Sequence, residues 1–123
     1  MNEEKIVVDA NFVMTPHELK IDVFGETKKL LGRIEWIVPG PVLEELKFMA
    51  DKGQVGARVG LEMLEKEGYE VVDAGGPADG AVIEVARRLG GRVASMDGEV
   101  RRRARKYSLK LVGVRGRQKV VLD

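Results

Sequence analysis

A chain of 123 residues has the length of one domain and can bury a core without disulfides or structural metals. It has no cysteine and a single histidine, His17, which excludes thiolate zinc sites, cysteine nucleophiles and histidine-rich metal centres. Charged residues make up 33% of the chain, yet the formal net charge is only +1, which excludes a molecule that is basic throughout. A basic edge beside an acidic pocket remains compatible with this total.

The first residues do not resemble a targeting segment. Residues 1–5 are polar and acidic, whereas a signal peptide is basic and then apolar. No apolar run approaches the ~20 residues that a membrane-spanning helix needs. We therefore expect one domain over residues 1–123, located in the cytoplasm and without a membrane partner.

Hydrophobic periodicity and Gly or Pro punctuation divide the chain into alternating strands and helices. Thr15-Pro16 is expected to mark a loop. In chain order we predict a strand over 5–9, a helix over 18–31, a strand over 34–38, helices over 42–52 and 55–67, a strand over 69–72, a helix over 77–89, a strand over 92–96, a helix over 99–107, and strands over 109–114 and 119–122. This alternation predicts an α/β fold with a mainly parallel sheet between two layers of helices. The last two strands can pair as an antiparallel hairpin at one edge.

Two aspartates follow apolar strands directly. Asp9 comes after Ile6-Val7-Val8, and Asp97 comes after residues 93–96. Taken singly, each has an ordinary explanation as a turn residue or a helix N-cap. Because functional sites of such folds form outside the carboxyl ends of the strands, both are also candidate site residues.

Two further acids lie on helix faces that otherwise point inward. Asp79 shares a helical face with Val82, Ile83 and Ala86, although the helix dipole alone would also favour an acid in the first turn. Glu45 borders the inward face of its helix, where the alternative is a boundary side chain that reaches water. Glu44 points away from that face.

The four acids together indicate a metal site. If the predicted order of strands and helices holds, Asp9, Glu45, Asp79 and Asp97 meet at one rim of the sheet, where their charges would repel without a cation. Mg²⁺ or Mn²⁺ is the natural cation for oxygen ligands, and it can align a phosphodiester and activate a water. The neutral residues Asn11 and Ser95 near the same rim could hold a carboxylate or a metal-bound water, or serve as ordinary turn residues. Glu99, two residues past Asp97, could join the site, but we expect it to be a surface acid in the first turn of its helix.

At these residues the sequence resembles the PIN-domain nucleases, a family that includes the VapC toxins of toxin–antitoxin pairs. The resemblance rests on four blocks in the family's order: Val7-Val8-Asp9-Ala10-Asn11, Glu45-Leu46, Pro77-Ala78-Asp79-Gly80 and Ser95-Met96-Asp97. Ser95 and Met96 stand where the family has Thr and Asn. The segment over residues 19–24 is similar to an archaeal branch related to rRNA-processing nucleases.

The resemblance implies a PIN-like α/β/α sandwich, dependence on Mg²⁺ or Mn²⁺, and endonucleolytic cleavage of RNA. It also implies a homodimer and, for a toxin, an antitoxin protein as partner. The toxin role and the rRNA-processing role both stay open from the sequence.

A basic segment follows the last acid. Val100, Ala104 and Tyr107 are spaced to anchor the helix over 99–107, so its basic residues cover the other faces. Such side chains bind phosphates without reading the base sequence, although a solvated face with salt bridges is the plain alternative. The candidate RNA contacts are Arg101, Arg102, Arg103, Arg105, Arg115 and Arg117.

Two other functions compete with the nuclease. A phosphohydrolase could use Asp9 as a covalent nucleophile, but that class usually has a second Asp where this chain has Asn11. A PIN-like module that only binds RNA or protein would have no need for four mutually repelling carboxylates.

Overall fold

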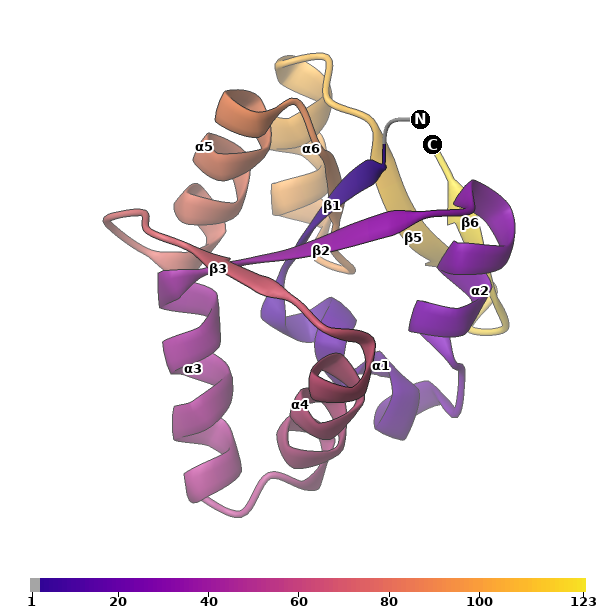
Figure 1. Ribbon diagram of the computed structural model, residues 1–123, viewed down its shortest axis with the longest axis vertical. Helices are drawn as coiled ribbons and strands as arrows, with labels where there is room; N and C mark the ends of the chain where they lie inside the picture. Colours follow the sequence, from indigo (N-terminus) through magenta and orange to yellow (C-terminus); the bar gives the residue numbers. More distant parts are fainter. Residues whose placement is uncertain (1–2) are drawn as a thin grey trace.

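The computed structural model describes residues 3–123, so the first two residues of the polar start lie outside the described part. Figure 1 shows the elements, which are β1 (Glu4–Val8), α1 (Ala10–Leu19), α2 (Val23–Leu31), β2 (Ile34–Pro39), α3 (Gly40–Asp51), α4 (Val55–Glu67), β3 (Glu70–Val72), α5 (Ala78–Leu89), β4 (Arg92–Ala94), α6 (Gly98–Lys106), β5 (Leu111–Arg115) and β6 (Lys119–Leu122). Among the described residues, no helix is both long and apolar enough to cross a bilayer.

The strands form one sheet in the order β3-β2-β1-β4-β5-β6. The neighbours from β3 to β5 pair in parallel, and β6 pairs with β5 antiparallel. The predicted mainly parallel sheet and its terminal hairpin are therefore confirmed. The chain first builds outward from β1 to β3 and then crosses to the other side of β1 with β4. Between β1 and β4 the connections diverge, which opens a crevice at their carboxyl ends.

Helices cover both faces of the sheet, as the predicted three-layer sandwich requires. In Figure 1, α5 and α6 lie together on the upper side, and α1, α2 and α4 lie on the other side. Helix α3 contacts both α4 and α5, so it bridges the two layers beside the carboxyl ends of the strands. The core between the layers includes Phe12, Phe24 and Trp36, whose rings meet edge to face. Trp36, the only tryptophan in the sequence, is a core residue and is 2% exposed.

The predicted loop at Thr15-Pro16 and the single helix over 18–31 are wrong. The chain instead forms α1 directly after β1 and a separate α2, with the break at Lys20, whose φ is 61°. Pro16 lies inside α1 and removes one helical hydrogen bond, which normally disfavours a helix. Here the side chain of Asp9 accepts a hydrogen bond from the backbone N–H of Ala10 at the start of α1, and Pro16 is buried by packing.

Helix α1 is fixed by a close crossing with α4. A Cβ added at Gly60 would lie 2.2 Å from the carbonyl oxygen of Val13, so only glycine allows the two backbones to approach this closely. Gly56, one turn earlier in α4, lies against Met14. The crossing matters for function because α1 carries Asn11 and Met14 to the crevice described above.

Candidate functional site

A pocket of about 440 Å³ lies at the carboxyl ends of β1 and β4. All four predicted acids line it, and each comes from a different part of the fold: the end of β1, helix α3, the first turn of α5 and the start of α6. The lining residues are Asp9, Ala10, Asn11, Met14, Glu45, Met49, Pro77, Ala78, Asp79, Asp97 and Val100. Acids that are up to 88 positions apart in sequence, Asp9 and Asp97, therefore share one cavity.

Asp9 is held firmly where β1 becomes α1. Its residue is only 6% exposed, and its backbone N–H still bonds to the carbonyl of Ala94 in β4. One carboxylate oxygen accepts the N–H of Ala10 at 2.9 Å, and the other accepts the hydroxyl of Ser95 at 2.8 Å and the amide of Asn11 at 3.3 Å. The carboxylate is thus aimed by neutral donors, with no cationic partner among residues 3–123.

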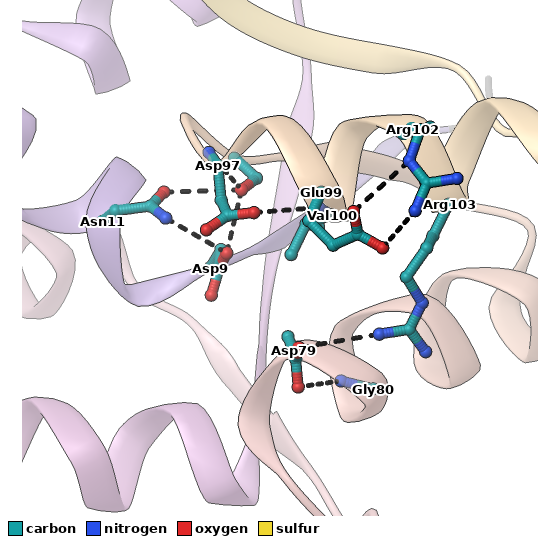
Figure 2. A network of polar contacts seen from close by, with 10 residues as sticks. Asp9, Asn11, Asp79, Gly80, Asp97, Glu99, Val100, Arg102 and Arg103 are labelled. Atoms are coloured by element: carbon teal, nitrogen blue, oxygen red, sulfur yellow. Dashed lines mark hydrogen bonds and ion pairs between the residues drawn. The ribbon is translucent and has the colours of Figure 1, made fainter.

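Ser95 and Asn11 connect the two aspartates that follow strands. Ser95 is fully buried, and its hydroxyl donates a hydrogen bond to the Asp9 carboxylate. The same oxygen accepts the backbone N–H of Asp97 at 3.0 Å. The Asn11 side-chain oxygen accepts the N–H of Met96 at 2.8 Å. Figure 2 shows Asp9, Asn11 and Asp97 side by side at this point of the pocket. Asn11 and Ser95 therefore lie at the rim of the sheet near the acids. They hydrogen-bond to the Asp9 carboxylate and to the backbone N–H groups of Met96 and Asp97.

Asp97 and Asp79 each lie at the start of a helix on the pocket rim. Asp97 is the N-cap of α6 and accepts the N–H of Val100 at 3.0 Å. Asp79 lies in the first turn of α5, and Figure 2 shows its contacts with Gly80 and Arg103. The Arg103 guanidinium lies 3.6 Å from the Asp79 carboxylate, and both side chains are substantially exposed. Such a long, solvated pair is weak, so Asp79 remains available to a ligand.

The acids influence one another electrostatically. Burial raises the pKa of Asp9 above its ordinary value, hydrogen bonds from Ser95 and Ala10 oppose the rise, and the Asp97 carboxylate adds to it. Partial loss of water at the pocket raises the pKa of Glu45, although the residue as a whole is exposed, and the charges of Asp9 and Asp79 raise it further. The pocket therefore carries more negative charge than its surroundings neutralise.

The donor set suits a hard divalent cation, because it offers only carboxylate, amide and hydroxyl oxygens. Within the described residues, however, no three acidic or imidazole side chains already lie close enough to form an ion-binding cluster. A bound cation would draw the acids closer together than they lie here. Asp9 is fixed by its buried donors, whereas Glu45 is exposed and Asp79 is held only by solvated contacts, so these two side chains can adjust.

The predicted basic residues of α6 differ in their surroundings. Arg102 is exposed and forms an ion pair with Glu99, and this contact lowers the pKa of Glu99. Glu99 is therefore the surface acid that we expected. Arg103 reaches Asp79, as described above. Arg101 instead points inward, donates to two backbone carbonyls and pairs with Asp123, so we remove it from the candidate RNA contacts.

The remaining candidates are exposed. Arg105 lies on α6, whereas Arg115 and Arg117 lie at the β5–β6 turn. Sequence reasoning missed the pairing of Arg103 with Asp79 and the inward direction of Arg101. Gly113 was the available signal for Arg101, since a glycine in a β-strand often marks a place where another group approaches the backbone closely.

Comparison with known proteins gives a consistent result. A family model described as a PIN-like domain matches residues 6–117. The chain is 30% identical over 107 residues to Ribonuclease VapC9 of Archaeoglobus fulgidus, an alignment that covers 84% of this chain and 77% of that protein.

Two solved structures share the fold. The PIN domain endonuclease Utp24 superposes with a TM-score of 0.79 at 22% identity, covering 97% of this chain and 90% of the other. A domain of a functionally unknown protein from Methanocaldococcus jannaschii gives a TM-score of 0.68 at 20% identity, covering 92% of each chain. At these identities the likeness concerns the fold alone.

Proposed function

This chain belongs to the PIN-like domain family, and we propose that it is an endoribonuclease that uses Mg²⁺ or Mn²⁺ to hydrolyse RNA phosphodiester bonds. One observation carries the proposal. Four carboxylates from four separate elements line a single pocket at the point where the strand order reverses. A fold gains no stability from collecting like charges, so a ligand that neutralises them explains the arrangement best.

We assign Asp9, Glu45, Asp79 and Asp97 as the residues that would hold the metal. When bound, such an ion lowers the pKa of a water and offsets charge on the phosphate oxygens. Ser95 and Asn11 keep the Asp9 carboxylate directed into the pocket, because their hydrogen bonds occupy one of its oxygens. Met14, Met49 and Val100 supply the apolar part of the pocket wall.

The substrate is proposed to be RNA. The relative at 30% identity is a ribonuclease, and arginines that are exposed or half-buried lie on α6 and at the β5–β6 edge of the sheet. These are Arg102, Arg103, Arg105, Arg115 and Arg117, and they would contact phosphates rather than base edges. Arg103 is closest to the pocket, since it already contacts an acid that lines it.

A cleavage assay tests the proposal directly. Single-stranded RNA is incubated with the protein in Mn²⁺, in Mn²⁺ with excess chelator, and with the Asp9→Asn variant. Asp51→Asn is the matched control, because Asp51 is an exposed acid at the end of α3 and does not line the pocket. We expect cleavage by the wild type and the control, and none with chelator or with Asp9→Asn.

Other results would assign a different function. Tight RNA binding without cleavage in any divalent metal would make the chain a binding module. Turnover of a phosphomonoester through a phosphoenzyme would make it a phosphohydrolase that uses Asp9 as nucleophile.

The similarity to Ribonuclease VapC9 favours a toxin role over rRNA processing. A toxin of this type is expected to act as a homodimer and to be inhibited by an antitoxin protein. Expression of the chain alone should then arrest growth, and Asp9→Asn should not. Accumulation of precursor rRNA on depletion, without arrest on expression, would assign the processing role instead.

A further inference from the structure

Arg101 differs from its basic neighbours on α6. Its side chain is 17% exposed, compared with 70% for Arg102 and 37% for Arg103. One terminal nitrogen donates to the carbonyl of Ser95 at 3.1 Å and to the carbonyl of Val112 at 3.3 Å, and the other pairs with the Asp123 carboxylate. These three partners belong to the protein's own backbone and C-terminal edge, which is unusual for an arginine in a basic segment.

The fold provides space for this guanidinium. A Cβ added at Gly113 would lie 2.4 Å from one terminal nitrogen of Arg101 and 2.9 Å from the central carbon of the guanidinium. Gly113 lies inside β5, where glycine otherwise weakens a strand. The glycine therefore allows Arg101 to lie flat against the backbone of β5.

Arg101 acts where β4 and β5 separate. Ala94 and Val112 are the last paired residues of these strands, and the next ladder bond, from the Ser95 N–H to the Val112 carbonyl, is long at 3.4 Å. The guanidinium joins the same two residues through their carbonyls. It thus holds together two backbones whose own hydrogen bonding is ending.

The segment that Arg101 holds is the one that builds the pocket. Directly beyond the Ser95 carbonyl, the Met96 N–H reaches Asn11 and the Asp97 N–H reaches the Ser95 hydroxyl, which in turn holds Asp9. A shift of the Ser95 backbone would therefore move both aspartates relative to each other.

We propose that Arg101 is a positioning residue that fixes residues 95–97, and through them the relative placement of Asp9 and Asp97, by clamping the Ser95 and Val112 carbonyls in the space left by Gly113. Its consequence for catalysis rests on the proposed nuclease function. An arginine that instead contacted RNA would contribute to substrate affinity and leave this backbone unaffected.

The kinetic test compares Arg101→Lys and Arg101→Met with Arg58→Met, an exposed arginine on α4 that does not line the pocket. With RNA and Mn²⁺, we expect kcat to fall about 10–100-fold in the Arg101 variants while KM changes less than about twofold. Gly113→Ala should give the same pattern, because it displaces the guanidinium without altering Arg101. A raised KM with unchanged kcat would overturn the proposal in favour of an RNA contact.

A second measurement needs neither metal nor activity. Amide hydrogen exchange of Met96 and Asp97 in the metal-free protein should accelerate at least ~10-fold in Arg101→Lys and Gly113→Ala, and not in Arg58→Met. Unchanged exchange would overturn the clamp. If the wild type cuts no RNA, the proposed function fails while exchange still decides the structural claim. If Arg101→Met does not fold, the lysine and Gly113→Ala variants carry both tests.

Discussion

Replacing Ser95 with alanine should destabilise the protein more than the loss of one hydroxyl usually does. The Ser95 side chain is fully buried and makes two hydrogen bonds with different roles. It donates to the Asp9 carboxylate at 2.8 Å, and it accepts the backbone N–H of Asp97 at 3.0 Å. Alanine removes both bonds without adding a clash.

The size of this destabilisation depends on the two groups that lose their hydrogen-bond partner, the Asp9 carboxylate and the Asp97 N–H. A bond to an ionised carboxylate contributes about 1.5–3 kcal/mol, and a buried N–H that loses its acceptor costs about 1–3 kcal/mol. Asp9 retains the donors Ala10 and Asn11, and the pocket can supply water to the exposed side of the gap, so the two costs do not add fully. We expect the free energy of unfolding to fall by about 2–4 kcal/mol at neutral pH.

Urea denaturation of the metal-free protein measures this change. Thr27→Val is the control, because Thr27 is also fully buried but its hydroxyl only donates, at 2.6 Å, to the Val23 carbonyl inside α2. When that hydroxyl is removed, the Val23 carbonyl keeps its helical hydrogen bond. We therefore expect the free energy of unfolding to fall by about 1 kcal/mol or less. If Ser95→Ala costs no more than Thr27→Val, the reasoning about the shared network is refuted.

Three further predictions concern charge, packing and RNA binding. Because the folded-state pKa values of Asp9 and Glu45 are raised, their contribution to stability is full below the pKa of the unfolded carboxyls and is lost as pH rises through the folded values. At low pH more of these carboxyls are protonated, and a protonated carboxyl does not bind a cation. Thermal melts should therefore show that Mn²⁺ stabilises the protein more at pH 7.5 than at pH 4.5, and equal stabilisation at both pH values would contradict this. Gly60→Ala should cost about 3 kcal/mol or prevent folding, since its Cβ would lie 2.2 Å from a carbonyl oxygen of α1. Gly98→Ala, where nothing lies within 4 Å, should change the unfolding free energy by less than about 1 kcal/mol in the same denaturation assay. Arg105→Gln in a catalytically inactive background should weaken RNA binding and reduce the slope of log affinity against log salt by about 0.7, and an unchanged slope would place Arg105 outside the RNA path.

The sheet was predictable because apolar blocks alternate with helical periodicity over most of the chain, and crossover connections then allow few arrangements. The start of α1 could not be predicted in this way. Pro16 is a strong local signal against a helix, and what overrides it is tertiary: the Asp9 cap and the close approach of α4 at Gly60. A single sequence does not reveal that Gly60 faces Val13.

The site shows a similar division. The positions of Asp9 and Asp97 followed from strand ends, and those of Asp79 and Glu45 from helical faces, so their meeting in one pocket was predictable from topology. Arg101 could not be separated from Arg102 by spacing, since the two are adjacent in a basic run after Val100. Their different surroundings depend on the space beside the β5 backbone that Gly113 leaves open for Arg101.

Asp9 and Asp97 also begin α1 and α6, because the side chain of each accepts a backbone N–H at the start of its helix. Removing either side chain as alanine would therefore loosen a helix start as well as empty a place in the pocket, at a cost of about 0.5–2 kcal/mol. A relative that no longer cleaves anything would still be under pressure to keep Asp, Asn, Ser or Thr at these two positions. Asparagine is accordingly the informative inactivating replacement, and an aspartate found at either position in a related chain does not by itself demonstrate chemistry.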